Sequence, residues 1–157
     1  MRPPGRGSKL TVSPGVPERM EYRASSSIEA DPDTIWAILT DAGAYPDWDN
    51  GVIMIDGTIA PGERIKIYSE LDPKRGHAVR VTQFEPGTEM TWTGGMPLRL
   101  FKGVRTFELA PQGNGTTLFT MEERFSGPLR PLIGRTLPDF GPSFEKFAGG
   151  LKQRAER

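Results

Sequence analysis

The sequence contains no cysteine and a single histidine, His77, among its 157 residues. The lack of cysteine excludes disulfides, thiolate-bound zinc and thiol chemistry, and a lone histidine excludes metal sites built from several imidazoles. Many catalytic relays also use a histidine, and in this chain they are restricted to one position. We therefore expect neither a metal site nor a cofactor.

An excess of charge of either sign is also missing, because 20 basic residues balance 20 acidic ones. Such a chain has no global field to attract a nucleic acid or an anionic membrane, although a local patch of one sign is compatible with this balance. No run of about 18 apolar residues occurs, so no segment is expected to cross a bilayer as a helix. These absences predict a soluble, cytoplasmic protein that binds no nucleic acid and inserts into no membrane.

The first 18 residues, MRPPGRGSKLTVSPGVPE, carry positive charge but lack the apolar stretch of a signal peptide, so they are expected to form a flexible arm. The remaining residues, 19–157, have the size of one domain and show no internal repeat. The 19 glycines and 15 prolines are spread between periodic segments, where they mark turns.

Alternation of apolar and polar residues is the main signal after the arm, and it predicts a series of strands. The expected strands are 20–28, 52–56, 64–71, 77–85, 88–94, 101–109 and 116–125. The stretches DPKRG, EPG and APQGNG are expected to form the turns between the later ones. This spacing describes one antiparallel sheet of six to seven strands with hairpin connections.

Helical patterns flank the strand series. Asp31 is expected to cap the first helix, with Pro32 at its first position and Gly43 ending it. Pro138 and Pro142 are expected to interrupt the C-terminal pattern, with a break near Pro138. That pattern carries one apolar stripe, made of Phe140, Phe144, Phe147 and Leu151. The order of elements indicates an α+β fold with helices on one face of the sheet.

Five stretches carry a resemblance to a known superfamily. They are IEADPDTIWAILTDAGAYPDWDN, PGERIKI, EPGTEMTW, GVRTFELAPQGNGTTL and EERFSGPLRPLIGR. In this order they resemble the polyketide cyclase/dehydrase-like branch of the START-related, pollen-allergen-like helix-grip superfamily (SRPBCC), over residues 20–154. The resemblance implies a helix-grip domain at 19–157, in which a curved antiparallel sheet wraps a long C-terminal helix and two short helices follow the first strand.

The same resemblance gives a role to the turn at Pro46, Asp47 and Trp48. In the implied fold the short helices plug one end of the space between sheet and long helix. We expect Trp48 to bury its ring there, with a binding role as the alternative, while Asp47, Asp49 and Asn50 cap and turn the backbone.

The positions of the predicted strands that point inward are mostly apolar, and the resemblance implies that they line a cavity. Small-molecule pockets have volumes of roughly 300–1,000 Å³. A filled core would use the same residue types, so both readings stay open. The residues expected to contact a ligand are Ile67, Val79, Met90, Trp92, Phe107, Phe119, Met121, Phe140 and Phe144.

Arg105 and Glu123 are charged residues whose strand phase also points inward. If the turn pairs Leu109 with Thr117, Glu123 lies diagonal to Arg105 and within its reach. We expect a buried Arg105–Glu123 pair that orients a ligand's carbonyl or carboxylate, because an unpaired buried charge is costly. The alternatives are a bulge that turns either residue to solvent, or a purely structural pair. An Arg105 more exposed than Phe107 would contradict the buried pair.

Three further positions have two readings each. His77 is a candidate general base at the cavity mouth, with a solvated histidine as the alternative. Tyr22 could donate a hydrogen bond into the cavity or pack as core. Met96 and Leu98 follow two glycines in a loop that could gate entry.

Two classes of function follow. The first is a binder of a small hydrophobic or aromatic molecule, polyketide- or lipid-like, in an internal cavity between the sheet and the C-terminal helix. An enzymatic version would be a polyketide cyclase/dehydratase-like lyase or isomerase, with Glu123, Arg105 and His77 as candidate catalytic residues. The second is a protein-interaction domain with a filled core and no small-molecule ligand. An exposed Phe101 or Met96 would favour the second class, and an internal void the first.

Overall fold

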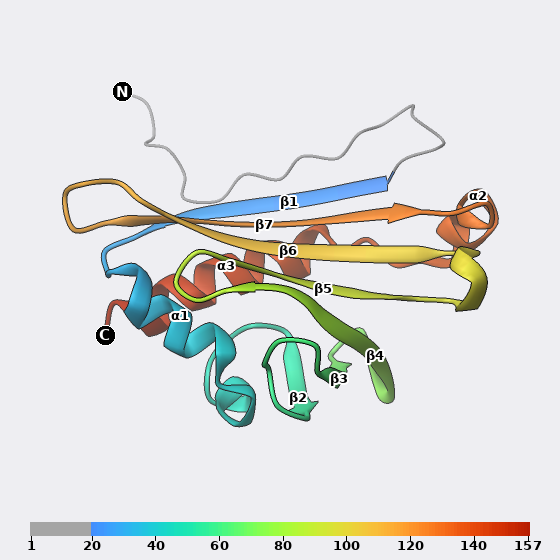
Figure 1. Cartoon of the computed structure of the whole chain (residues 1–157), viewed down its shortest axis with the longest axis horizontal. Helices are drawn as coiled ribbons and strands as arrows, with labels where there is room; N and C mark the ends of the chain where they lie inside the picture. Colours follow the sequence, from blue (N-terminus) through green and yellow to red (C-terminus); the bar gives the residue numbers. More distant parts are fainter. Residues whose placement is uncertain (1–19) are drawn as a thin grey trace.

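The computed structural model describes residues 20–157, and the predicted arm, residues 1–18, lies outside them. Seven strands form one antiparallel sheet in the order β1-β7-β6-β5-β4-β3-β2 (Figure 1). The strands are β1 (Met20–Ile28), β2 (Val52–Asp56), β3 (Arg64–Ser69), β4 (Asp72–Glu85), β5 (Glu89–Gly95), β6 (Lys102–Pro111) and β7 (Thr117–Ser126). The helices are α1 (Pro32–Thr40), α2 (Arg130–Ile133) and α3 (Gly141–Ala155), with 3-10 turns η1 (Ala42–Asp47), η2 (Pro97–Arg99) and η3 (Gly134–Thr136). The α+β helix-grip architecture is confirmed.

The sheet curls around α3 and contacts it near both edges (Figure 1). At one edge, Lys152 Nζ donates a hydrogen bond to the carbonyl oxygen of Ser27 in β1, at 2.7 Å. Towards the other edge, Lys146 Nζ donates to Glu70, directly after β3, at 2.8 Å. Among residues 20–157, no helix is both long and apolar enough to span a bilayer. The predicted stripe packs inward, since α3 buries Phe144, Phe147 and Leu151.

The first helix begins as predicted and ends earlier. Asp31 Oδ1 accepts the backbone N–H of Thr34 at 2.8 Å and caps α1. Gly43 does not end the helix, because the chain turns at the end of α1 and continues as η1, which contains Gly43. The buried hydroxyl of Tyr45 donates to the carbonyl oxygen of Leu39 at 2.7 Å and ties η1 to α1.

The stretch DPKRG, predicted as a turn, belongs to β4. Asp72 pairs with Ser69, so a two-residue connection joins β3 to β4. Regular pairing resumes only at Ile67 and His77, which leaves residues 73–76 as an irregular stretch of the strand. Proline and glycine are common in such bulges, because proline cannot donate to the ladder and glycine allows close contact.

The C-terminal helical pattern breaks where expected. Leu137 is extended, with φ −77° and ψ 144°, because a residue before proline disfavours the helical region. The chain then re-enters a helix at Gly141, whose N–H is accepted by Asp139 Oδ1 at 2.9 Å. Pro142 does not interrupt α3, since it lies in the first turn, where no backbone N–H is needed.

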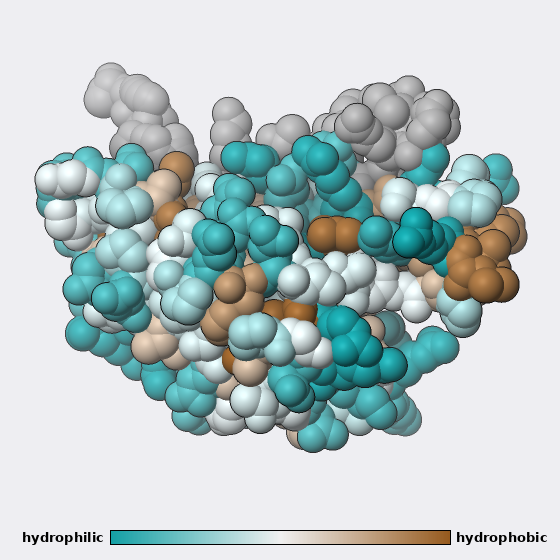
Figure 2. Space-filling model, viewed as in Figure 1, coloured by the Kyte–Doolittle hydropathy of each residue, from teal (hydrophilic) through white to brown (hydrophobic). Residues whose placement is uncertain are grey.

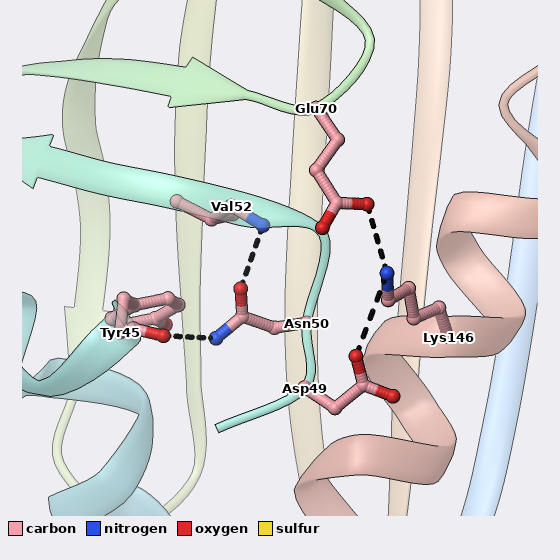
Figure 3. A network of polar contacts seen from close by, with 6 residues as sticks. All are labelled: Tyr45, Asp49, Asn50, Val52, Glu70 and Lys146. Atoms are coloured by element: carbon pink, nitrogen blue, oxygen red, sulfur yellow. Dashed lines mark hydrogen bonds and ion pairs between the residues drawn. The ribbon is translucent and has the colours of Figure 1, made fainter. Parts of the chain in front are cut away.

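The turn around Trp48 fills one end of the space between sheet and α3. The buried ring of Trp48 lies 5.2 Å from those of Tyr45 and Phe147, measured between centroids. Asn50 orders the turn, since its Nδ2 donates to the Tyr45 carbonyl oxygen at 2.8 Å and its Oδ1 accepts the N–H of Val52 at 2.7 Å (Figure 3). The expected structural role of Trp48 is confirmed.

The backbone of the same turn lies directly against α3. An added Cβ at Gly150 would overlap the carbonyl oxygen of Asp49, so only glycine permits this approach. Lys146 reinforces the contact, because its Nζ lies 3.5 Å from Asp49 Oδ1 as well as binding Glu70 (Figure 3).

Replacing Gly150 with Ala should lower the free energy of unfolding by about 3 kcal/mol, because the new methyl group must push α3 away from Asp49. Gly149→Ala is the matched control: nothing lies within 4 Å of a Cβ at that position. The higher helix propensity of alanine should there stabilise the protein by up to about 1 kcal/mol. Urea unfolding measures both variants, and a Gly150→Ala protein as stable as the Gly149→Ala one would contradict the close approach.

Candidate functional site

Four hydrogen-bonding side chains line up across four neighbouring strands. Tyr22 in β1 pairs with Glu123 in β7, Glu123 pairs with Arg105 in β6, and Arg105 pairs with Trp92 in β5. Directly paired residues point to the same face of a sheet, and this is the face that α3 covers. We call Tyr22, Trp92, Arg105 and Glu123 the polar row.

An ion pair forms the centre of the polar row. Nε and Nη2 of Arg105 donate to Oε1 of Glu123, at 2.8 and 2.6 Å. The two residues are directly opposite, not diagonal as predicted. The reason is that β6 continues to Pro111, which pairs with Thr117, so the expected pairing of Leu109 with Thr117 is wrong by two residues.

The Arg105–Glu123 pair is partly exposed, which corrects the expectation of a buried pair. The side chains of Arg105 and Glu123 are 22% and 14% exposed, whereas Phe107 on the same strand is fully buried. Contact with water lowers the large desolvation cost that two enclosed charges would carry. Arg105 still faces the helix, because its guanidinium carbon lies 4.9 Å from the ring centre of Phe144 in α3.

Tyr22 lies at the β1 end of the polar row among aromatic rings. Its ring centroid is 6.4, 5.5 and 5.9 Å from those of Phe125, Phe140 and Phe144. Burial raises the pKa of the Tyr22 hydroxyl, the nearby charge of Asp139 raises it further, and a backbone hydrogen bond from Phe140 opposes them. The hydroxyl therefore keeps its proton at neutral pH and can serve as a donor.

Trp92 ends the polar row with an unused donor. Its Nε1–H is buried and has no hydrogen-bond partner within residues 20–157, and the residue is 2% exposed. An unsatisfied buried N–H costs about 1–3 kcal/mol. The indole Nε1–H of Trp48 shares this state, but it belongs to the turn after η1, where the ring packs against Tyr45 and Phe147. Sequence reasoning treated Trp92 as apolar lining, because strand phase cannot show whether a buried donor finds a partner.

The apolar residues expected to line a cavity do face the interior. Of them, Met90, Phe107, Phe119, Met121 and Phe144 are buried, and Ile67, Val79 and Phe140 are partly buried. Aromatic rings meet at their centre, where Phe147 lies 5.8 Å from Phe107 and 6.0 Å from Phe119. This part of the interior is packed, and contact of these residues with a ligand stays a prediction.

Residues 127–140, which we call the end segment, lie at one end of the sheet (Figure 1), and the ring of Phe140 lies 5.5 Å from that of Tyr22 in the polar row. The segment contains α2 and η3 but no strand. Its apolar side chains Ile133, Leu137 and Phe140 pack against the core. Its backbone is joined to the β5–β6 connection by the N–H of Leu129, which donates to Leu100 at 2.9 Å.

His77 does not join the polar row. Its side chain is 56% exposed, and its Nε2 lies 3.4 Å from Asp72 Oδ2, which fits the solvated alternative. Two hollows of about 460 and 320 Å³ open on the surface, and no polar-row residue lines either. Within residues 20–157, no three side chains of metal-ligating type come together.

A comparison with known families matches residues 19–156 to the family described as polyketide cyclase/dehydrase and lipid transport. The chain belongs to this family. The match spans the whole sheet and all three helices, and it agrees with the resemblance drawn from the sequence motifs.

Several solved structures share the fold of this family member. A START superfamily protein from Mycobacterium smegmatis is 19% identical with a TM-score of 0.61, covering 87% of this chain and 97% of that chain. The ZhuI aromatase/cyclase from Streptomyces sp. R1128 is 9% identical with a TM-score of 0.68, covering 88% and 94%. A norcoclaurine synthase from Thalictrum flavum is 14% identical with a TM-score of 0.64, covering 87% and 94%. At these identities the likeness concerns the fold alone. A comparison with curated protein sequences finds no match.

Removing one partner of the ion pair should cost more stability than removing both. Glu123→Leu leaves the Arg105 guanidinium without its partner and should lower the free energy of unfolding by about 2 kcal/mol. Arg105→Leu combined with Glu123→Leu should recover most of that loss. Glu122→Leu, on the opposite face of β7, is the control and should change stability by less than about 1 kcal/mol. Equal losses in the single and the double variant, measured by denaturant unfolding, would show that the two side chains are not coupled.

Proposed function

We propose that the protein binds a small hydrophobic or aromatic molecule, polyketide- or lipid-like, between the sheet and α3, beside the polar row. The observation that carries the proposal is the buried, unpartnered Nε1–H of Trp92, next to the half-buried guanidinium of Arg105. Buried donors in folded proteins almost always have a partner. A ligand carbonyl, hydroxyl or carboxylate would supply one.

Arg105 has donors to spare for such a ligand. Its hydrogen bonds to Glu123 use Nε and Nη2, while a guanidinium carries five N–H groups. Glu123 holds the guanidinium plane in place, and Phe144 lies over it at 4.9 Å. A fixed fork of donors is suited to a planar acceptor such as a carboxylate or a quinone-type carbonyl.

The end segment supplies the route of entry. It closes the interior next to Tyr22 through Ile133, Leu137 and Phe140, and it is held by short helical turns instead of strand pairing. Regions with few ladder hydrogen bonds open at low free energy. Its movement would uncover the polar row while the seven strands stay in place.

Binding is favoured over catalysis by the same geometry. Glu123, the carboxylate of the polar row, accepts two hydrogen bonds from Arg105 at Oε1, so it is ion-paired and a weaker general base than a lone carboxylate. Cyclase or dehydratase activity, which the family description and the ZhuI aromatase/cyclase suggest, would then depend on holding a flexible substrate folded.

Native mass spectrometry of the freshly purified protein should detect a stoichiometric hydrophobic passenger, which extraction then identifies. Arg105→Leu should lose it while remaining folded. Trp92→Phe removes the unpaired N–H and should weaken binding about tenfold, since the ligand acceptor loses its donor.

Trp48→Phe is the matched control, because it removes the other unpartnered indole N–H and should leave the passenger bound. The opposing result is a bare chain whose melting temperature also fails to respond to a panel of lipids and aromatic polyketides. That outcome would favour the alternative, a protein-interaction domain with a filled core, which the 42% exposure of Met96 supports and the burial of Phe101 does not.

A further inference from the structure

The β5–β6 connection and α2 form an end of the molecule that exposes large apolar side chains. Leu98 is 88% exposed, Leu132 65% and Met96 42%, whereas Phe101 is buried. The two segments lie side by side, because the N–H of Leu129 donates to the carbonyl oxygen of Leu100. Figure 2 shows hydrophobic residues gathered in a rounded projection at the end where Figure 1 draws α2. We call Met96, Leu98 and Leu132 the apolar tip.

The backbone holds Leu98 in this exposed position against its own preference. Leu98 and Arg99 both have positive φ, at 61° and 56°. This region is disfavoured for residues with a Cβ, and a bulky pair there is uncommon. A leucine that is both strained and exposed contributes nothing to the core, which points to a use outside the domain.

The chain around the apolar tip is basic, although the whole sequence is neutral. Residues 95–104 and 125–138 contain no Asp or Glu. Their charged residues are all cationic: Arg99, Lys102 and Arg135 keep contact with solvent, whereas Arg130 is buried. The local patch that the overall balance allowed is therefore present, on the same two segments as the tip.

A hollow of about 320 Å³ adjoins the tip at Met96, and the charged side chains that line it are all positive. Its polar side chains are Arg80, Thr82, Thr93, Arg99 and Lys102, with no carboxylate among the lining residues. Within residues 20–157, no Asp or Glu forms an ion pair with Arg99 or Lys102. Guanidinium, ammonium and hydroxyl donors together are suited to a phosphate group.

We infer that this end docks on the surface of an anionic phospholipid bilayer. Leu98 and Leu132 would enter the headgroup layer, and a lipid phosphate would occupy the hollow between Arg99 and Lys102. Apolar side chains with Lys and Arg beside them hold peripheral proteins on membranes, since burial of the apolar groups and attraction to anionic lipids add. The projection is convex, and a fluid bilayer can accept it without a complementary groove. The contact is peripheral, with no spanning segment.

The inference goes beyond the proposed ligand site and stands without it. Leu132 belongs to the end segment, so docking would bring the proposed entry route to the lipid surface. Vesicle binding can nevertheless be measured on a protein whose interior binds nothing.

Sedimentation with vesicles of equal parts phosphatidylcholine and phosphatidylglycerol tests the inference. The full chain should bind them, bind pure phosphatidylcholine vesicles far less, and lose binding as salt is raised. Leu98→Ser combined with Leu132→Ser should weaken binding at least tenfold. Arg99→Gln and Lys102→Gln should each weaken it about fivefold.

Matched controls lie elsewhere on the surface. Met54→Ser replaces an apolar residue that is 43% exposed on β2, and Arg75→Gln replaces an exposed cation on β4. Both should leave vesicle binding unchanged. Arg105→Leu should also bind vesicles normally, so loss of an internal ligand and loss of docking are distinguishable.

Three results would overturn the inference. The first is equal binding to both kinds of vesicle, and the second is full binding by the Leu98→Ser, Leu132→Ser variant. The third is a response to soluble glycerol phosphate or inorganic phosphate without vesicle binding, which would make the hollow a small-anion site. Binding to an acidic protein but not to vesicles would likewise reject the bilayer as the partner.

Discussion

The packing of the Phe147 ring against its aromatic neighbours is the interaction on which the rest of the fold depends. The ring lies within 5.2–6.2 Å of four other aromatic rings, from η1, the turn after it, β6 and β7. One side chain of α3 thus joins the plug, the centre of the sheet and the helix. Aromatic contacts of this kind add to the free energy of simple burial, and here they fix the position of the helix inside the curl.

This packing also decides where chemistry is available. The centre of the interior is filled by rings, and the charged pair Arg105–Glu123 lies on the part of the strands towards the end segment. There the sheet carries Tyr22, Glu123, Arg105 and Trp92 in one line. Three of the four have a partner or water, and the fourth, Trp92, has an unused donor. The packing of aromatic rings around Phe147 thus fills the centre of the interior and leaves the polar row beside it.

Local features of the fold could be predicted from the sequence, and long-range ones could not. Alternation and the Asp31 cap are properties of neighbouring residues, so the first strand and helix start as predicted. The register of β6 on β7 depends on where the hairpin closes, and the prediction was wrong by two residues. Side chains repeat every two residues along a strand, so this error kept Arg105 and Glu123 on the inner face. The contact between Arg105 and Glu123 could therefore be predicted, but not that the two residues are directly paired across β6 and β7.

Exposure could not be predicted at all where it depends on a distant segment. Arg105 retains water contact, Phe101 is covered and Leu98 is not, and none of this follows from strand phase. Turn-forming residues were misassigned for a related reason. DPKRG was predicted as a turn but lies in an irregular part of β4, and Gly43 was predicted to end the first helix but lies in the 3-10 helix η1. Proline and glycine mark irregular backbone, but tertiary contacts decide which kind forms.

The contact between Gly150 and Asp49 has a consequence for how the molecule can move. It places the C-terminal half of α3 in direct backbone contact with the turn after η1, with no side chain between them. The other half begins beside the end segment, which lacks strand pairing. If a ligand enters by the proposed route, its access depends on a local opening at this half of the helix, whose free energy is separate from that of unfolding the sheet.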